Sequence, residues 1–225
     1  MKAPIIYISK AVHEKELLNF CTEKNWELVH FPMIRFNEVD FPEPDPTSFD
    51  IIFFSSSRSV NFFLAKVLPT AQHKLACIGE TTAQELEKWG YTADFIGIKS
   101  GHPETVSKQF EQFVGEKRVL FPQSNISHQS MQRRLVDEQT LNLVVYETFL
   151  VPLKLTMKPG VLVFTSPSNV RAFLQMNQID PAQQQIIAWG TTTASYLEQS
   201  NVHVDSILEK SNVESLIEVL EKINS

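Results

Sequence analysis

The sequence predicts an α/β protein made of two similar units, each with a parallel sheet covered by helices. Short apolar runs, rich in β-branched and aromatic residues, alternate with segments of helical period along the whole chain. The chain also repeats itself, because residues 51–64 recur as 161–174, and residues 77–86 recur as 188–197. Two similar units in one chain imply two similar domains that present the same chemistry to one ligand.

The strands are predicted from short apolar runs bounded by turn-forming or polar residues. The predicted strands are residues 5–8, 27–31, 51–54, 75–78, 93–96, 119–121, 143–146, 161–164, 186–188 and 203–207. Between them, segments 60–67 and 213–220 carry apolar residues at i, i+3, i+4 and i+7, and segment 106–113 carries a shorter apolar stripe. Such spacing is typical of helices that pack one face on a sheet.

The repeat also has a fainter component. Residues 5–8 and 28–31 resemble residues 119–122 and 144–147, so the chain runs A, B, A′ and B′, with two strands in A and three in B. Joining one A to one B gives a five-stranded domain. Sequence order permits A with B, or a crossed pairing in which B and A′ are inserted between A and B′. Prolines interrupt the chain before both B units and do not choose between these pairings.

The composition excludes several classes of protein. With 43% hydrophobic and 20% charged residues, the chain resembles an ordinary globular protein, and no apolar run is long enough to span a bilayer. The N-terminal segment lacks the apolar core of a signal peptide, so a cytoplasmic location is expected. The formal net charge is −6, and Lys and Arg do not cluster. Nucleic-acid binding through phosphate contacts is therefore not expected.

Metal binding is not expected either. Cys21 and Cys77 are the two cysteines of the chain, and the six histidines are scattered. Neither residue type shows the spacing of a metal site. The two cysteines are predicted to be small buried apolar side chains.

Hydroxyl residues follow the first strand of each B unit, where the strand runs directly into a helix. Ser166 precedes Pro167 and is predicted to be a helix N-cap with proline at the first helical position. Backbone amides at such a terminus, helped by Ser168 in one copy and by Ser56 and Ser57 in the other, can bind a carboxylate or phosphate. The alternative is that these serines only cap their helices.

Two further turns, 79–82 and 190–193, repeat the arrangement. A glycine ends each strand, and a threonine is predicted to cap the following helix while its amides stay exposed. Ligands of open α/β sheets bind at the carboxyl ends of the strands, so these loops together predict an anion-binding site. The loop 121–127 is either another anion site or a capped turn. Neither a glycine-rich nucleotide motif nor a Gly-x-Ser-x-Gly motif occurs in the chain.

Taken together, these motifs resemble the uroporphyrinogen-III synthase family. The resemblance extends over essentially the whole chain and rests on residues 54–56, 78–83, 120–122, 126–127, 145–148, 164–168 and 190–194. It implies the crossed pairing, with one discontinuous domain from residues 1–34 and 152–225 and an inserted domain from residues 35–151. It also implies that each domain is a flavodoxin-like parallel sheet and that two strand-like linkers join them.

The resemblance further implies a reaction of tetrapyrrole (heme) biosynthesis. Linear hydroxymethylbilane loses water and closes to uroporphyrinogen III with ring D inverted, which makes the enzyme a cyclising hydro-lyase without a metal or organic cofactor. Tyr146 matches the family's tyrosine near the cleft, which is considered a proton donor to the departing hydroxyl. Substrate carboxylates are expected to bind to Lys10, Ser56, Ser57, Arg58, Thr82, Ser124, Asn125, Ser127, Ser166, Ser168, Thr192 and Thr193.

Two positions depart from the family, because Lys10 and Gln123 stand where its members often carry arginine. A monomer satisfies everything in the sequence. The main alternative function is a non-catalytic two-domain protein that closes on a small polyanion. A second alternative is a sugar- or nucleotide-transferring enzyme, although such an enzyme needs carboxylates at strand ends, where this chain has mainly hydroxyls.

Overall fold

A computed structural model of the protein describes residues 4–98 and 102–223. Contacts within the chain divide it into two compact units. Unit 1 combines Met1–Arg35 with Phe149–Ser225, and unit 2 is the intervening segment Phe36–Thr148. The chain therefore leaves unit 1 once and returns to it once.

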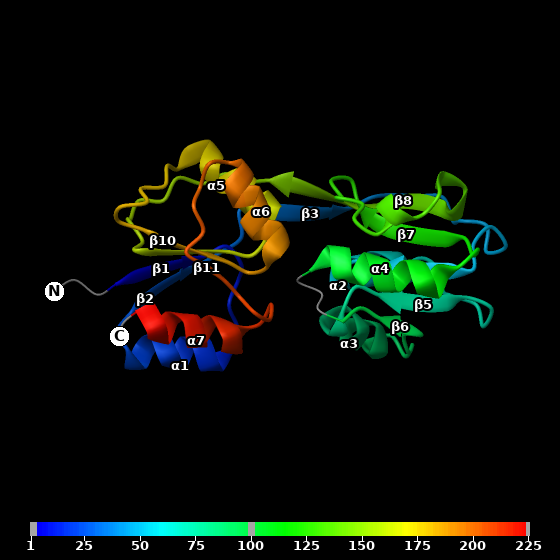
Figure 1. Ribbon diagram of the computed structural model, residues 1–225, viewed down its shortest axis with the longest axis horizontal. Helices are drawn as coiled ribbons and strands as arrows, with labels where there is room; N and C mark the ends of the chain where they lie inside the picture. Colours follow the sequence, from blue (N-terminus) through cyan, green and yellow to red (C-terminus); the bar gives the residue numbers. More distant parts are fainter. Residues whose placement is uncertain (1–3, 99–101, 224–225) are drawn as a thin grey trace. The chain divides into compact units, whose positions relative to one another are not determined.

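Among the described residues, unit 1 contains a five-stranded parallel sheet with the order β11-β10-β9-β1-β2 (Figure 1). Numbered within the unit, this is the 2-1-3-4-5 order of flavodoxin-like folds. The pairing of β1 and β2 with strands from the C-terminal part of the chain is the crossed pairing of the repeat. The strands are β1 (Ile5–Ile8), β2 (Glu27–His30), β9 (Val161–Phe164), β10 (Gln185–Ala188) and β11 (Ser206–Ile207).

Helices cover both faces of the unit 1 sheet. Successive strand residues point to opposite faces, so Ile6 and Ile8 pack with residues of α1 and α7, whereas Tyr7 packs with residues of α5 and α6. In Figure 1, α1 and α7 lie side by side beneath the strands of this unit. The helices are α1 (Lys15–Glu23), α5 (Pro167–Met176), α6 (Thr191–Gln199) and α7 (Val213–Ile223).

In unit 2, the part of the chain that the structure describes forms a six-stranded sheet with the order β3-β8-β7-β4-β5-β6. Strands β8, β7, β4, β5 and β6 are parallel. Here A′ and B take the places that A and B′ take in unit 1, but B comes first in the chain, so the order numbered within the unit is 3-2-1-4-5. The prediction of five strands was wrong here, because β3 adds a sixth at the edge. The strands are β3 (Ile34–Glu38), β4 (Ile51–Phe54), β5 (Lys74–Cys77), β6 (Phe95–Ile96), β7 (Val119–Ser124) and β8 (Thr140–Leu150).

Strands β3 and β8 carry the chain between the two units, as strand-like linkers. The amide of Val39 donates to the carbonyl of Val145 (3.4 Å), and the amide of Val151 donates to the carbonyl of Met33 (2.8 Å). Residue numbers rise along one strand while they fall along the other, so β3 runs antiparallel to β8. The two crossings of the chain are therefore hydrogen-bonded to each other.

Helices also cover both faces of the unit 2 sheet. On one face, Phe54 packs with residues of α2 and α3; on the other, Phe53 packs against Phe110 of α4 with ring centroids 4.4 Å apart. Figure 1 shows α2 and α3 as neighbours, in agreement with their contacts. The helices are α2 (Ser57–Leu64), α3 (Glu80–Lys88) and α4 (Pro103–Val114), and two short 3₁₀ turns follow at Gln132–Arg134 and Asp137–Gln139.

Candidate functional site

The hydroxyl-rich loops lie at the carboxyl ends of the strands, beside the point in each sheet where the strand order reverses. In unit 1 this point lies between β1 and β9, and in unit 2 it lies between β7 and β4. Ligands of open α/β sheets bind at such switch points. The loops that follow β1, β9, β7 and β4 therefore contain the candidate site residues of the two units.

In unit 1, Ser166 begins α5 as the sequence predicted. Its Oγ accepts a hydrogen bond from the amide of Asn169 (3.3 Å), and Pro167 occupies the first turn. Ser168 follows in the same turn and is half-buried. The first amides of a helix have no partners within the helix, and its dipole favours negative charge there. This terminus is suited to bind a carboxylate.

A buried pair of hydroxyl residues fixes the same edge of unit 1. Ser9 has no exposed surface, and its Oγ accepts from the amide of Thr165 (2.8 Å). In return, the Thr165 hydroxyl donates to the Ser9 carbonyl (3.1 Å). These bonds hold the carboxyl ends of β1 and β9 together. The sequence predicted neither residue, because their partnership joins positions 156 residues apart.

Lys10 follows β1 at this edge and has two close contacts. Its Nζ pairs with the Glu14 carboxylate and lies 5.1 Å from the centre of the Trp189 ring. Burial acts to raise the pKa of Glu14, but hydrogen bonds from Lys10 and from the amides of His13 and Glu14, together with the Lys10 charge, lower it to about 2. Glu14 therefore holds Lys10 in place and also competes with any ligand carboxylate for its charge.

In unit 2, Ser56 caps α2 through a reciprocal pair of bonds. Its Oγ accepts from the amide of Ser59 (3.2 Å), and the Ser59 Oγ accepts from the amide of Ser56 (3.3 Å). This capping box uses serine at both positions. Ser57 donates to the carbonyl of Thr81 (3.3 Å) and so joins the first turns of α2 and α3.

Tyr146 lies next to this capped terminus. It is 7% exposed, and its hydroxyl lies 3.5 Å from the Ser56 Oγ. Its ring stacks on Phe62 and meets Phe36 edge to face. The structure thus brings together Tyr146 and Ser56, two residues that the sequence singled out from positions 90 residues apart.

Arg58 joins the same cluster. Its guanidinium carbon lies 3.8 Å from the centre of the Phe36 ring. The residue as a whole is exposed, but its guanidinium packs against the Phe36 ring. Loss of solvation lowers its pKa, and the interaction with Tyr146 partly offsets that effect. Arginine stays charged at neutral pH, so a cation lies beside the tyrosine at the start of α2.

Comparison with known proteins gives the family. The family model of uroporphyrinogen-III synthase HemD matches residues 15–218. The chain belongs to the uroporphyrinogen-III synthase family. A uroporphyrinogen-III synthase of Chlorobaculum parvum is 30% identical over 204 residues, which cover 80% of this chain and 82% of that protein.

Solved structures of uroporphyrinogen-III synthases share the fold. That of Helicobacter pylori has a TM-score of 0.68 at 21% identity and covers 98% of this chain and 99% of its own. A mutant synthase of the extremely thermophilic bacterium Thermus thermophilus has a TM-score of 0.67 at 16% identity and covers 99% and 98% of the two chains. The α/β architecture and the crossed strand order are therefore those of the uroporphyrinogen-III synthase fold.

The threonine caps predicted for α3 and α6 are absent. The N-caps of α3 and α6 are Gly79 and Gly190, neither with a side-chain capping bond. Thr82 and Thr193 are the third residues of their helices and are each 4% exposed, because that position faces the sheet. The prediction of threonine caps was wrong, and direct contact of these two hydroxyls with a substrate is not supported. Thr192, one residue earlier, is half-buried.

The loop after β7 uses its polar side chains internally. The Ser124 Oγ donates to Asn125 Oδ1 (2.9 Å) and lies 2.8 Å from the Thr148 hydroxyl, and Asn125 Oδ1 also accepts from the Thr148 amide (2.9 Å). Ser127 Oγ accepts from the amide of Gln129 (3.3 Å). Of the two interpretations of this loop, these bonds favour the capped turn.

Gln123, where the resemblance implied an arginine in other members, also makes internal hydrogen bonds. It is 4% exposed, its Nε2 donates to Asn142 (3.1 Å), and its Oε1 accepts from Gln132 (3.1 Å). The side chain is therefore a structural group.

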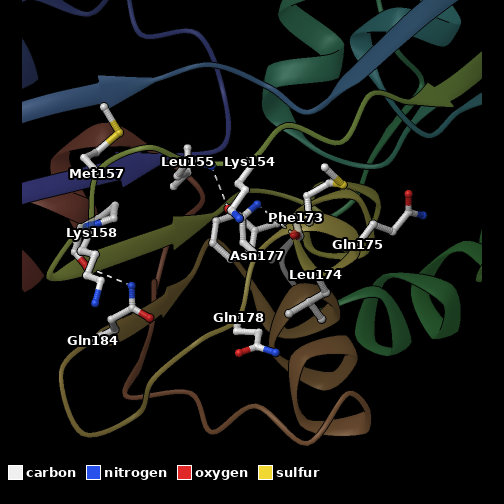
Figure 2. Close-up of a pocket in the computed structure, with 12 residues that line it drawn as sticks. Lys154, Leu155, Met157, Lys158, Phe173, Leu174, Gln175, Asn177, Gln178 and Gln184 are labelled. Carbon is white, nitrogen blue, oxygen red and sulfur yellow. Dashed lines mark hydrogen bonds between the residues drawn. The ribbon is translucent and has the colours of Figure 1, made fainter.

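A cavity of about 540 Å³ lies at the other edge of the unit 1 sheet, near the amino ends of β9 and β10 (Figure 2). None of the predicted site residues lines it. The side-chain amide of Asn177 donates to the Leu153 carbonyl (2.7 Å), and that of Gln184 donates to the Pro159 carbonyl (2.9 Å). These side chains hold the segment that leads into β9, so the cavity is distinct from the candidate site.

The described residues, 4–98 and 102–223, contain no group of three or more His, Cys, Asp or Glu side chains placed to hold a metal ion. Over the same ranges, no helix combines the length and apolarity needed to cross a membrane. Cys21 and Cys77 are both buried, as predicted.

Proposed function

We propose that the protein is a uroporphyrinogen-III synthase, a cyclising hydro-lyase that converts linear hydroxymethylbilane to uroporphyrinogen III with inversion of ring D. Family membership supports this activity. The structural observation that carries it is the cluster in unit 2, where the Tyr146 hydroxyl lies 3.5 Å from the N-cap hydroxyl of α2 and beside Arg58. A proton donor thus lies next to an anion-binding terminus.

Tyr146 is proposed to donate its proton to the hydroxyl of the hydroxymethyl group. The carbon–oxygen bond then breaks, water leaves, and an azafulvene remains. The azafulvene is protonated at this stage, and the substituted carbon of ring D attacks it to give a spirocyclic intermediate. The bond between that carbon and its original methylene bridge then breaks, and the inverted ring D closes again through its unsubstituted carbon. The proton that this carbon loses returns to the tyrosinate. The enzyme's main contribution is to hold the substrate in the conformation that inverts ring D.

The substrate carboxylates are proposed to bind at helix N-termini and a few cations. The net charge of −6 gives no general attraction for a polyanion, so the attraction must be local. Amides at the start of α2 and α5 provide it, together with Arg58 and Lys10. The proposed binding residues that are at least partly exposed are Lys10, Ser56, Ser57, Arg58, Asn125, Ser127, Ser166, Ser168 and Thr192.

We also propose that residues 1–34 with 152–225 and residues 35–151 act as two domains, and that the protein is a cytoplasmic monomer. The compact units and their two strand connections support the domains. Size-exclusion chromatography with light-scattering detection tests the oligomeric state and should give a mass near 25.7 kDa.

The decisive test supplies freshly prepared hydroxymethylbilane to the purified protein and identifies the porphyrin isomer after oxidation. Isomer III is expected. Isomer I alone, as in the enzyme-free control, would contradict the proposal. A protein that binds the tetrapyrrole tightly yet gives isomer I would instead be the non-catalytic polyanion-binding protein.

A further inference from the structure

Asn169 links the start of α5 to a distant part of unit 1. Asn169 is the third residue of α5, and it is 3% exposed. Its Nδ2 donates to the Ser166 Oγ (3.0 Å), and its Oδ1 accepts from the amide of Met33 (2.8 Å). A residue in the first turn of a helix can support the cap without a bond to a distant segment. The bond to Met33 therefore gives this side chain a second role.

The first consequence concerns the Ser166 hydroxyl. Its oxygen accepts two hydrogen bonds from Asn169, one from the backbone amide (3.3 Å) and one from Nδ2 (3.0 Å). A hydroxyl oxygen accepts two bonds and donates one. Among residues 4–98 and 102–223 no acceptor is recorded for the remaining hydrogen of Ser166. Asn169 thereby leaves Ser166 as a donor, which is the role that a carboxylate ligand requires.

The second consequence concerns the segment that leads into β3. Met33 has no exposed surface, and both of its backbone polar groups are bonded. Its amide donates to Asn169, and its carbonyl accepts from the amide of Val151 (2.8 Å), just after β8. The two crossings of the chain are therefore tied at this point to the first turn of α5.

The other half of the repeat shows that the helix itself does not need asparagine. Ser59 occupies the corresponding position of α2, and its hydroxyl donates to the Ser56 carbonyl (2.7 Å) within the same turn. Serine completes the capping box there. The longer amide in unit 1 keeps the cap and adds a bond to a segment 136 residues away.

We propose that Asn169 is a positioning residue for the reaction, which rests on the proposed synthase function. Through Nδ2 it presents the Ser166 hydroxyl to a substrate carboxylate. Through Oδ1 it fixes the backbone at Met33 to the same turn. One buried side chain thus sets both the binding group and the start of the connection to unit 2.

Two variants separate these roles. Asn169→Asp keeps an oxygen that accepts from Met33, but it replaces the donor to Ser166 with an acceptor that draws the serine hydrogen inward. The KM for hydroxymethylbilane should rise about tenfold or more, with a smaller change in kcat, because the lost partner is a charged substrate group. Asn169→Ser, which copies the other repeat, should keep the cap and lose the Met33 bond.

The amide of Met33 gives a readout that does not depend on activity. Hydrogen exchange measured by NMR should be at least about tenfold faster at Met33 in Asn169→Ser than in the wild type, and nearly unchanged in Asn169→Asp. Asn177→Ser is the matched control, because Asn177 lies at the other end of α5 and bonds to Leu153 and Leu155. That variant should change neither KM nor the exchange at Met33.

A double-mutant cycle tests whether Asn169 acts through Ser166. In a protein that already carries Ser166→Ala, the further substitution Asn169→Asp should raise the KM only slightly. Additive effects would overturn the proposal, as would unchanged Met33 exchange in Asn169→Ser. If the wild type yields only isomer I, the synthase function fails. Hydrogen exchange at Met33 still tests whether Asn169 holds the backbone at Met33. If it yields isomer III and Asn169→Asp leaves KM unchanged, the positioning role fails alone.

Discussion

The ring of Tyr146 lies nearly parallel to that of Phe62, with centroids 5.1 Å apart and planes inclined by 16°. Phe36 packs against the same tyrosine edge to face, with centroids 6.0 Å apart. Two aromatic contacts from different elements leave the phenol little freedom to rotate away. They direct its hydroxyl towards Ser56 at the start of α2.

This arrangement predicts the effect of two substitutions on turnover. Tyr146→Phe keeps the aromatic contacts and removes the proton donor, so kcat should fall about 100-fold or more with little change in KM. Phe62→Leu keeps the Tyr146 hydroxyl but removes the ring that stacks on Tyr146. The phenol is then held less firmly, so kcat should fall about three- to tenfold. Steady-state kinetics with hydroxymethylbilane measure both. Tyr91→Phe, in the same unit, is the control, and an unchanged turnover of Tyr146→Phe would remove the tyrosine from the mechanism.

Arginine and lysine are expected to give different KM values at position 58. Arg58→Lys keeps the charge, but an ammonium group cannot reproduce the flat stacking of the guanidinium on Phe36 or its paired donors. The KM for hydroxymethylbilane should therefore rise about threefold to tenfold, and Arg58→Gln should raise it further. Arg133→Lys, on an exposed turn, should leave KM unchanged. Equal KM values for Arg58→Lys and the wild type would place Arg58 outside the binding site.

Glu14 predicts a pH-dependent contribution to stability. Its folded-state pKa of about 2 lies below the ordinary 4.5, so its ionised form stabilises the folded protein above pH 4.5. That contribution is lost as the pH falls from 4.5 towards 2. The side chain is 37% exposed, so the effect is small. Urea denaturation should show Glu14→Gln to be less stable than the wild type at neutral pH and to approach it in acid. A constant difference would contradict the ion pair with Lys10.

The two thiols predict a chemical reactivity. Burial raises the pKa of Cys21, and burial together with the charge of Glu80 raises that of Cys77 to about 12. The thiolate is the reactive form, so iodoacetamide at neutral pH should modify neither residue while the protein is folded. Cys21 belongs to unit 1 and Cys77 to unit 2, so peptide mass spectrometry in rising urea follows each unit separately. Rapid modification of Cys77 without urea would show that its strand opens readily.

Local sequence signals predicted most of the fold. Strands 5–8, 51–54 and 161–164 agree with the structure at both ends, because each is a continuous apolar run buried in the middle of a sheet. Strand β3 was missed, since its five residues lie between prolines and only Ile34 is buried. Strands β6 and β11 are shorter than predicted because they lie at sheet edges with one neighbour.

The site was predicted only where its contacts are local. The Ser166 cap follows from its neighbour Pro167, and the structure contains it. The bond from Met33 to Asn169 has no local signal, because its partners are far apart in the chain. The threonine caps failed for a related reason. Sequence shows that a threonine follows a glycine turn, but the sheet beneath the helix decides which way Thr82 and Thr193 face.

The insertion of unit 2 within unit 1 has a consequence for synthesis on the ribosome. When residue Thr148 is made, unit 2 is complete, while unit 1 consists of little more than β1, α1 and β2. The neighbour that β1 needs on its other side, β9, has not yet been translated. The middle of the chain can therefore fold before its beginning. Until β9 arrives, the apolar β1 presents an unpaired edge, which makes nascent chains stalled in this interval the ones most prone to aggregate.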